Sequence, residues 1–438
     1  MRYVLDFLYL LTLLLASPWL LVQSLRTGKY REGLAAKFFG FVPVRNSDRP
    51  CIWLHAVSVG EVNLLATLIA QISLRHPDCE CVVSTTTRAG YQLARRRYSD
   101  LTVFNCPLDF SWAVRRAVKR VRPQLLVLAE LELWPNLIAE AKRRGAHVAV
   151  INGRLSEKSF RGYSRIRWLL GPVLRKLDYI AAQTHEYADR FVALGAPRHK
   201  VQVTGSMKFD GAETDRANPR TRRLLELVGI ESHDTVLVAG STQMEEEAIA
   251  IACYRQLAGE FPRLRLIIVP RHPERFDQVA TALDESGLAW KRRTQLDLKS
   301  RNPLTRVLLV DTVGELGAWW GTADIALVGG SFGHRGGQNM IEPAAYGAAV
   351  CFGPHTQNFR DVVALLLAEK AAVVVNDLDE FVAFTRRLLE HPAEAEALGA
   401  RARAVVRTQL GATERTMEGL AALFNDVSSP QASARNAA

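Results

Sequence analysis

The sequence predicts an α/β protein with two doubly wound domains, each built on a parallel sheet. Short, continuously apolar runs alternate with helical patterns along almost the whole chain, which is typical of parallel strands that helices cover on both sides. The runs fall into two sets, separated by a polar stretch at 208–222. They lie at 52–55, 81–85, 125–129, 148–151 and 179–182, and then at 236–239, 264–269, 307–310, 325–328, 350–352 and 372–375.

Composition narrows the class of function. The chain has 438 residues, of which 48% are hydrophobic and 23% charged, so two or three folded domains are expected. A net charge of +11 favours acidic partners such as anionic lipid or phosphorylated sugars, while no signature of nucleic-acid binding accompanies it. The six cysteines lack disulfide-scaffold spacing and indicate a reducing compartment. The ten histidines form no ligand pattern, so no metal site is predicted.

The N-terminus is predicted to attach to a membrane. Residues 3–25 are almost all apolar, and about 20 such residues can span a bilayer. Basic residues follow this segment, which by the positive-inside rule leaves the rest of the chain in the cytoplasm. Asp6 and Pro18 weaken the span, so an anchor lying in the interface is the alternative.

The first site candidate follows the run at 52–55. Glu61 lies where a helix is expected to begin, and a helix N-terminus keeps a carboxylate ionised. An ionised carboxylate can take a proton from an attacking hydroxyl, which predicts a general base. The alternative is purely structural, because Ser58 and Glu61 also match the spacing of a capping box.

The second candidate follows the run at 125–129. Glu130 and Glu132 are two residues apart at the end of a strand, so both carboxylates are expected on one face. Like charges there are costly unless a cation meets them. Either acid is an alternative base to Glu61, and the other is expected to bind sugar hydroxyls or hold a lysine or arginine. The alternative is a solvated pair at a strand edge.

The second set of runs ends in residues that suit a nucleotide. Gly329, Gly330 and Ser331 follow a strand and precede a second glycine pair, then Asn339 and Glu342 at a helix start. Glycines let backbone N–H groups approach a phosphate, and Glu342 is placed to accept hydrogen bonds from ribose hydroxyls. Alternatively, the glycines only turn the chain and Glu342 only caps its helix.

Other strand ends add polar groups to this half. Ser241 and Thr242 suit a phosphate or a sugar, unless Thr242 and Glu245 merely form a capping box. Arg271 offers a fork of donors to a phosphate or carboxylate, and His272 stacks on a base or fills space. Lys208, at the domain boundary, is expected to reach into the cleft between the domains.

Taken in order, these motifs resemble a known family. The strings are HAVSVGE, ELELWPN, NGRLSEKS, TGSMKFD, AGSTQMEEE, PRHPERF and GGQNMIEPA. Together they are similar to the 3-deoxy-D-manno-octulosonic acid (Kdo) transferases, from the N-terminal anchor to about residue 425. The resemblance implies a GT-B fold with two Rossmann-like domains facing a cleft. It also implies inverting transfer of Kdo from CMP-Kdo to the tetraacylated, phosphorylated glucosamine disaccharide precursor of lipid A.

The resemblance also implies roles for these residues. Glu61 is then the general base, with Glu130 and Glu132 beside it in the acceptor half. The CMP is surrounded by Arg271, His272, Gly329, Gly330, Ser331, Asn339 and Glu342, with Lys208, Ser241 and Thr242 near the donor phosphate and the Kdo carboxylate. Leu131 departs from the family, which commonly has Thr between the two acids, and so does the Gly205-Ser206 turn. These departures bear on acceptor preference more than on the reaction.

The predicted organisation is an anchor at 1–30, an acceptor domain at 31–207, a linker at 208–222, a CMP-sugar domain at 223–426 and a disordered tail at 427–438. No cofactor is expected, and a metal is not obligatory, because a helix N-terminus with Arg or Lys can stabilise one leaving phosphate. The partners are CMP-Kdo, the lipid A precursor and the cytoplasmic face of the inner membrane. A nucleotide-sugar epimerase and a catalytically silent scaffold remain as alternatives.

Overall fold

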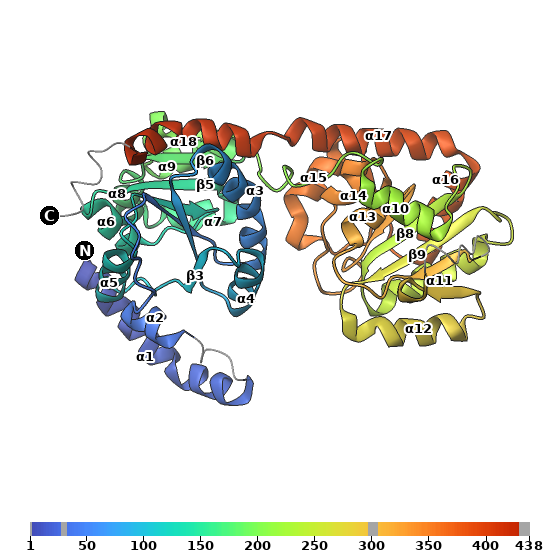
Figure 1. The fold of residues 1–438 in the computed structure, drawn as a ribbon, viewed down its shortest axis with the longest axis horizontal. Helices are drawn as coiled ribbons and strands as arrows, with labels where there is room; N and C mark the ends of the chain where they lie inside the picture. The colour runs from blue at the N-terminus through green and yellow to red at the C-terminus, as the bar shows by residue number, and fades with distance from the viewer. Residues whose placement is uncertain (1, 28–32, 297–304, 429–438) are drawn as a thin grey trace. The chain divides into compact units, whose positions relative to one another are not determined.

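The structure is a computed structural model that describes residues 2–27, 33–296 and 305–428. The chain forms two compact units (Figure 1). The first unit comprises Met1–Gly211 together with Leu410–Ala438, and the second unit comprises Ala212–Gln409. Each unit has its own parallel sheet, which confirms the prediction of two α/β domains.

The first unit is built on a seven-stranded parallel sheet with the order β3-β2-β1-β4-β5-β6-β7. The chain winds from β1 to the β3 edge, returns to place β4 beside β1, and then winds to the β7 edge. The strands are β1 (Cys51–His55), β2 (Glu80–Thr85), β3 (Thr102–Asn105), β4 (Leu125–Ala129), β5 (His147–Gly153), β6 (Tyr179–Ala182) and β7 (Val201–Val203).

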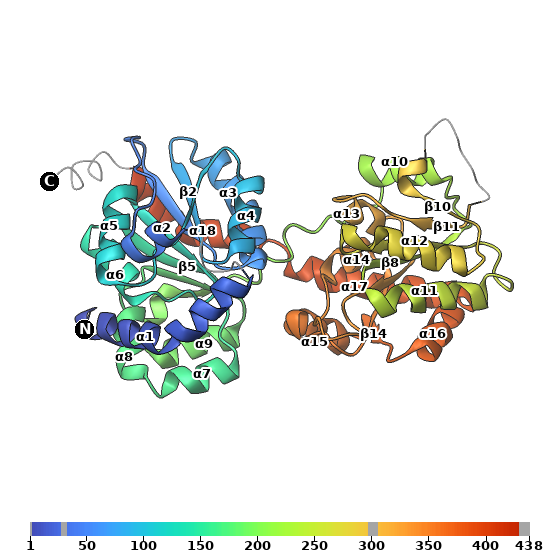
Figure 2. The same ribbon diagram turned by 90° about the horizontal axis from the view of Figure 1, so that it is seen from below.

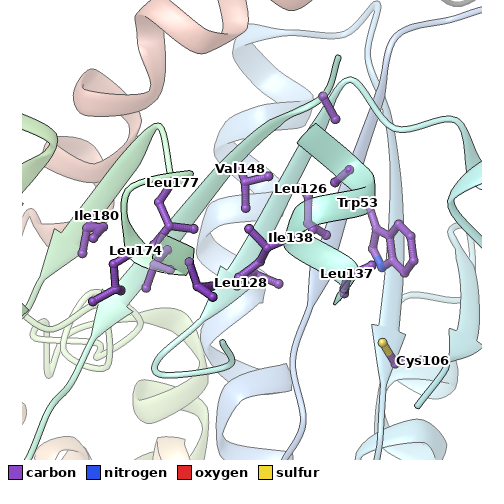
Figure 3. Packing of buried hydrophobic residues seen from close by; sticks show 14 of the residues in the cluster. Trp53, Cys106, Leu126, Leu128, Leu137, Ile138, Val148, Leu174, Leu177 and Ile180 are labelled. Atoms are coloured by element: carbon purple, nitrogen blue, oxygen red, sulfur yellow. The ribbon is translucent and has the colours of Figure 1, made fainter. Parts of the chain in front are cut away.

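Helices cover both faces of this sheet, because the central strands are apolar on both sides. On one face Trp53, Leu126 and Leu128 pack against Leu137 and Ile138 (Figure 3). The helices of this unit are α1 (Arg2–Thr27), α2 (Leu34–Phe39), α3 (Val59–Arg75), α4 (Arg88–Arg97), α5 (Ser111–Val121), α6 (Pro135–Arg143), α7 (Glu157–Ser164), α8 (Arg167–Leu174), α9 (His185–Leu194), η1 (Arg198–Lys200) and α18 (Ala412–Ser428).

The second unit repeats the plan with the strand order β10-β11-β9-β8-β12-β13-β14, all parallel. Its strands are β8 (Thr235–Thr242), β9 (Leu264–Pro270), β10 (Trp290–Arg292), β11 (Val307–Leu309), β12 (Ile325–Val328), β13 (Ala349–Phe352) and β14 (Ala372–Val374). Its helices are α10 (Pro219–Val228), α11 (Met244–Leu257), η2 (Pro273–Arg275), α12 (Phe276–Glu285), η3 (Arg293–Gln295), α13 (Leu316–Trp320), α14 (Ile341–Tyr346), η4 (Gln357–Phe359), α15 (Arg360–Ala368), α16 (Leu378–Glu390) and α17 (Pro392–Gln409).

The N-terminal segment forms α1 and belongs to the first unit. Within the described ranges, no helix is long and apolar enough to cross a membrane, so the prediction of a true span is not supported. The helix lies at the periphery of the first unit (Figure 2), where it contacts α5 and makes polar contacts through Asp6 and Tyr9. Much of its apolar surface is exposed, including Phe7, Leu14 and Leu15.

The end of the chain corrects the predicted domain boundaries. Residues 410–426 were assigned to the second domain, whereas α18 packs on the first sheet through Leu420 and Phe424 (Figure 1). Asp210 explains the return, because its carboxylate accepts hydrogen bonds from the backbone N–H groups of Gly411 (2.7 Å), Ala412 (3.3 Å) and Thr413. These donors are orphaned at a helix start and need such an acceptor. The tail beyond residue 428 lies outside the described residues.

The expected linker at 208–222 is also divided differently. Its first residues, up to Gly211, belong to the first unit. Its last residues begin α10, with Asn218 as the N-cap and Pro219 in the first turn. The Asn218 side chain accepts from the N–H of Thr221 at 3.0 Å, which is the usual capping arrangement. The charged residues and the proline that suggested a linker therefore belong in part to the start of α10.

Candidate functional site

The predicted acids of the first unit gather where the winding of its sheet reverses. β1 and β4 are neighbours, and the connections that leave them run to opposite edges of the sheet. A crevice forms at the carboxyl ends of such a strand pair and is the usual ligand site of doubly wound sheets. Glu61 lies in the first turn of α3, after β1, and Glu130 and Glu132 follow β4. The three acids are called the acid cluster below.

Ser58 is the N-cap of α3, and Glu61 reaches back to it as its alternative role predicted, but to the Ser58 hydroxyl and the Val57 N–H rather than to the Ser58 N–H of a full capping box. Its Oε1 accepts from the Ser58 hydroxyl at 2.7 Å, its Oε2 accepts from the Val57 N–H at 2.8 Å, and its own N–H donates to Ser58 Oγ at 3.3 Å. The side chain is only 7% exposed. Burial raises the pKa of Glu61 and the charge of Glu130 adds to this, while the hydrogen bonds oppose it. The cap fixes the carboxylate in place and leaves each oxygen a further lone pair.

Glu132 is the member of the acid cluster whose pKa lies near neutral pH. Burial raises the pKa of Glu132 to about 7, and the charge of Glu61 contributes next. The indole N–H of Trp134 donates to Glu132 Oε2 at 3.0 Å and opposes this rise. A buried carboxyl beside another carboxyl is the usual way in which a protein tunes an acid toward neutral pH.

Glu130 meets a cation, as expected of one member of the pair. Lys208 Nζ lies 2.8 Å from Glu130 Oε1. The lysine therefore lies with the acid cluster of the first unit, and the place near the donor phosphate that the resemblance implies for it stays a prediction. Asn152, at the end of β5, adds a long hydrogen bond of 3.5 Å to Glu130 and accepts from the N–H of Met207 at 3.0 Å.

Backbone strain marks the strand ends of both units. Glu130, Asn152 and Ser241 have φ values of 54°, 52° and 55°, in the left-handed region that non-glycine residues rarely occupy. Such strain gathers at functional sites, where the surrounding structure holds it in place. Asn152 was missed as a site residue, although asparagine after a buried strand is one of the few residues that tolerate this conformation.

His55 completes the surroundings of the acid cluster. It ends β1, is fully buried, and its Nδ1 lies 2.9 Å from Ser84 Oγ. Burial lowers the pKa of His55 to about 4, so the imidazole is neutral. The edge-to-face contact with Trp134, at 6.1 Å between ring centroids, links β1 to the loop that carries Glu132.

The candidate residues of the second unit also lie at a reversal of winding. β8 and β12 are neighbours in the middle of the sheet. Ser241 and Thr242 end β8, and Gly329, Gly330 and Ser331 follow β12, so the sheet brings these two segments together. The Gly329 N–H donates to the Gly240 carbonyl at 2.9 Å.

The glycine turn is nevertheless not open to a ligand in the way we expected. The N–H groups of Gly330 (2.7 Å), Ser331 (2.7 Å) and Phe332 (3.1 Å) donate to the carboxylate of Glu246. Burial raises the pKa of Glu246 and these three bonds oppose the rise. The chain's own carboxylate therefore fills the place that we assigned to a ligand phosphate.

Glu246 was missed because the capping box was placed one residue too early. The expected pair was Thr242 and Glu245, whereas the structure pairs Gln243 with Glu246, whose Oε2 accepts from the Gln243 N–H at 2.9 Å. The Thr242 hydroxyl donates instead to Glu247 at 3.1 Å, and Glu247 forms an ion pair with Arg275 at 2.9 Å. The run of three glutamates was the signal for this network.

Arg271, Asn339 and Glu342 lie close together. Asn339 Nδ2 donates to Glu342 Oε1 at 2.9 Å, and its Oδ1 accepts from the Ile341 N–H at 3.1 Å. Burial raises the pKa of Glu342, while the Asn339 hydrogen bond and then the charge of Arg271 lower it. The Arg271 N–H donates to the Thr242 carbonyl at 3.1 Å, which ties the end of β9 to that of β8. His272 is exposed beside it.

Two features bear on metal binding. Among residues 2–27, 33–296 and 305–428, no three His, Cys, Asp or Glu side chains are grouped to hold a metal ion. The sequence has an Asp-x-Asp pattern at Asp377 and Asp379, and Asp377 accepts from the Glu380 N–H at 2.9 Å. This hydrogen bond makes Asp377 the N-cap of α16.

Comparison with known proteins places the chain in a family. Residues 32–211 match the family model described as 3-deoxy-D-manno-octulosonic-acid transferase (kdotransferase). The 3-deoxy-D-manno-octulosonic acid transferase of Haemophilus influenzae is 32% identical over 421 residues, which cover 94% of this chain and 97% of that protein. The chain belongs to the 3-deoxy-D-manno-octulosonic acid transferase family. The protein of that name from Bordetella pertussis is 34% identical, over 92% of this chain and 94% of its own length.

Membership in the Kdo transferase family makes the chain a glycosyltransferase and confirms the resemblance drawn from the motifs. A solved structure supports the fold as well. UDP-GlcNAc 2-epimerase from Neisseria meningitidis bound to UDP-GlcNAc matches with a TM-score of 0.54 and 12% identity, over 85% of this chain and 100% of that one. At this identity the likeness concerns the fold alone.

The Glu246 contacts generate a first prediction. In Glu246→Ala, two buried N–H groups and the half-buried N–H of Phe332 lose their acceptor, and each buried group costs about 1–3 kcal/mol when left unsatisfied. We expect a lower melting temperature and weaker binding of cytidine nucleotides, measured by differential scanning calorimetry and isothermal titration. Glu245→Ala is the matched control, because Glu245 is the exposed neighbour on the same helix. Equal effects of the two substitutions would show that the Glu246 contacts do not hold the glycine turn.

Proposed function

We propose that this chain transfers Kdo from CMP-Kdo to the tetraacylated, phosphorylated glucosamine disaccharide precursor of lipid A. The similarity to Kdo transferases along nearly the full length of both chains carries the proposal. The acid cluster supports it, because Glu61, Glu130 and Glu132 lie at the switch point of the first sheet, where a substrate of a doubly wound domain binds. Transfer of this kind belongs to lipopolysaccharide biosynthesis.

The reaction forms one bond and breaks one. A hydroxyl oxygen of the acceptor attacks the anomeric carbon of Kdo, and the bond from that carbon to the CMP phosphate breaks with its electron pair going to CMP. The hydroxyl proton passes to Glu61, whose position is fixed by Ser58 and Val57. Attack opposite to the leaving group inverts the anomeric centre. The negative charge of the acid cluster favours the oxocarbenium character of the transition state.

The two units divide the substrates in this proposal. The first unit takes the acceptor at the acid cluster, and the second unit takes CMP-Kdo at the carboxyl ends of its strands, as in a GT-B enzyme. Arg271 and His272 face the nucleotide phosphate and base, and Asn339 holds Glu342 for the ribose hydroxyls. Ser241 and Thr242 lie next to the donor. The turn at 329–331, whose N–H groups donate to Glu246, borders the donor site without binding its phosphate.

We further propose that α1 attaches the enzyme to the cytoplasmic side of the inner membrane by lying in the interface. Apolar side chains on α1 are exposed, among them Phe7 (64%), Leu14 (69%) and Leu15 (74%). Phe39 and Phe41, at the end of α2 and just beyond it, are exposed too, and the guanidinium of Arg116 lies 4.4 Å from the centre of the Phe41 ring. Apolar and basic groups together suit a membrane of anionic lipid.

The deciding experiment for the reaction uses mass spectrometry. The protein is incubated with fresh CMP-Kdo and the tetraacyl, bisphosphorylated disaccharide in detergent. A mass gain of one Kdo or more is expected and counts the additions. In Glu61→Gln we expect the rate to fall by about 10²–10⁴ with unchanged melting temperature, since the base is lost but the cap can persist. Wild-type protein without any mass gain would refute the function, and an active Glu61→Gln would refute the base.

The pKa of Glu132 leads to a pH prediction. We expect kcat/KM to fall as the pH drops through about 7, because the carboxyl of Glu132 then gains a proton and the acid cluster loses a negative charge. In Glu132→Gln the acidic limb should move to lower pH, where the remaining acids titrate, and the rate should fall about 10-fold or more. Initial rates between pH 5 and 9 test this, and a limb at the same pH in both proteins would contradict it.

Membrane attachment is tested with vesicles that contain anionic phospholipid. The triple variant Phe7→Ser, Leu14→Ser, Leu15→Ser removes apolar side chains worth about 1.5–3 kcal/mol each when buried, so binding in a sedimentation assay should fall at least 10-fold. Leu74→Ser, which is 76% exposed on α3, serves as the control and should bind as wild type does. Undiminished binding of the triple variant would rule out α1 as the anchor.

A further inference from the structure

The N-terminal helix has a polar side that membrane attachment does not explain. Its Asp6 is only 6% exposed, although an aspartate in a membrane-facing helix would normally point to water. Burying a carboxylate costs several kcal/mol unless hydrogen bonds compensate for the lost water. The compensating hydrogen bonds are made by Asp6 and by Tyr9, which lies one turn further along α1, and they connect α1 to two other helices.

Asp6 caps another helix. Its Oδ1 accepts from the N–H of Ser111 at 2.8 Å, and its Oδ2 accepts from the Ser111 hydroxyl at 2.5 Å. Ser111 is the first residue of α5, and the residue at the N-cap position, Phe110, has no side chain that accepts a hydrogen bond. Asp6 therefore supplies, from α1, the acceptor that this helix start lacks in its own sequence.

Tyr9 reaches the cap of a second helix. Asp109 accepts from the N–H groups of Asn136 and Leu137, both at 2.9 Å, at the start of α6, where the N-cap residue again has no accepting side chain. The Tyr9 hydroxyl donates to the same carboxylate at 3.3 Å. The Asn136 amide completes the network, because its Nδ2 donates to the Asp109 carbonyl at 2.5 Å and to Asp6 Oδ1 at 3.4 Å.

The start of α6 is also the end of the loop that carries the acids. Only Pro135 separates Asn136 from Trp134, and Trp134 donates to Glu132. Because proline fixes its φ angle, this short link has one rotation fewer with which to absorb a shift of Asn136 before it reaches the loop. We propose that Asp6 and Tyr9 are positioning residues for the acid cluster, so that α1 contributes to turnover separately from its contact with the membrane. This inference rests on the proposed function.

The two sides of α1 allow the roles to be separated. Asp6→Ala removes both oxygens that accept from Ser111, and Tyr9→Phe removes one donor with little change of shape. Phe7→Ser is the matched control, because Phe7 adjoins Asp6 in the sequence but is 64% exposed. All three are assayed with CMP-Kdo and the tetraacyl disaccharide in detergent micelles, where vesicle binding is not needed.

We expect kcat of Asp6→Ala to fall about 10–100-fold with KM for CMP-Kdo unchanged, since misplacement by about 1 Å costs that much. Tyr9→Phe should lose about 3-fold, which follows from one weak hydrogen bond of about 0.5–1 kcal/mol. Phe7→Ser should keep the wild-type kcat while binding vesicles less well. The acidic limb of the pH profile of Asp6→Ala should move to lower pH, because burial is the main cause of the raised pKa of Glu132 and a loosened loop admits water.

The outcomes are distinct. Wild-type kcat in both Asp6→Ala and Tyr9→Phe would overturn the inference and leave α1 as a tether alone. A lowered kcat with an unmoved pH limb would also overturn it, because loss of folded protein scales the profile without shifting it. If Asp6→Ala does not fold, the kcat and pH limb of Tyr9→Phe decide. Absence of transfer by the wild-type protein would place the failure in the proposed function instead.

Discussion

Much of the described structure depends on buried carboxylates that accept hydrogen bonds from backbone N–H groups. A doubly wound domain brings strand ends and helix starts to one edge of its sheet, and each helix start leaves N–H donors without partners. The described chain meets this need with acids from elsewhere in the sequence. Asp6 serves α5, Asp109 serves α6, Asp210 serves α18, and Glu246 serves the turn after β12. Each acid thereby joins two segments that would otherwise meet only through apolar packing.

The number of hydrogen bonds that each carboxylate accepts also separates acids with a structural role from acids that can act in the reaction. The carboxylate of Glu246 accepts hydrogen bonds from three N–H groups of the turn and from the N–H of Gln243. These four bonds satisfy its oxygens, so its role is structural. Glu61 is held by fewer donors and has like charge nearby, and Glu132 keeps a single indole partner. A carboxylate with incomplete pairing next to another acid has a raised proton affinity, and that is the property a base requires.

The sequence was sufficient for the central strands and for the edge strand β14, but not for the other edges. Strands such as β4 and β12 are buried on both faces, so their side chains form unbroken apolar runs that stand out from any context. The strands β3, β7 and β10 lie near or at an edge, are short, and carry polar residues such as Gln202 and Lys291, so no run marks them. The return of α18 to the first unit was equally hidden, because its capping acid, Asp210, is 201 residues away from Gly411.

Prediction of the site was likewise successful for the positions of residues along the chain but not for contacts between distant segments. Motifs identified Glu130, Glu132 and Arg271 at strand ends, and Glu61 and Glu342 at helix starts that follow strands. Sheet geometry alone brings such segments to one edge. What they failed to provide was the partner of each group. The pairing of Lys208 with Glu130, and of Glu246 with Gly330, depends on contacts between residues 78 and 84 positions apart. Local patterns hold no information about such contacts. A charged residue near a strand end is therefore as consistent with a structural role, holding another segment of the chain, as with binding a substrate.

The placement of α18 has a consequence for dividing the protein. The second unit is an insertion into the first, since the first unit contains both the beginning and the end of the chain. A fragment cut after Gly211 would lack α18 and would expose the sheet face that Met417, Leu420 and Phe424 cover. Residues 212–409, in contrast, carry a complete sheet with helices and need nothing from α18. The first unit is thus the part that must be rebuilt, for example by joining α18 to residue 211 through a short flexible segment, whereas the second unit can be excised as one continuous piece.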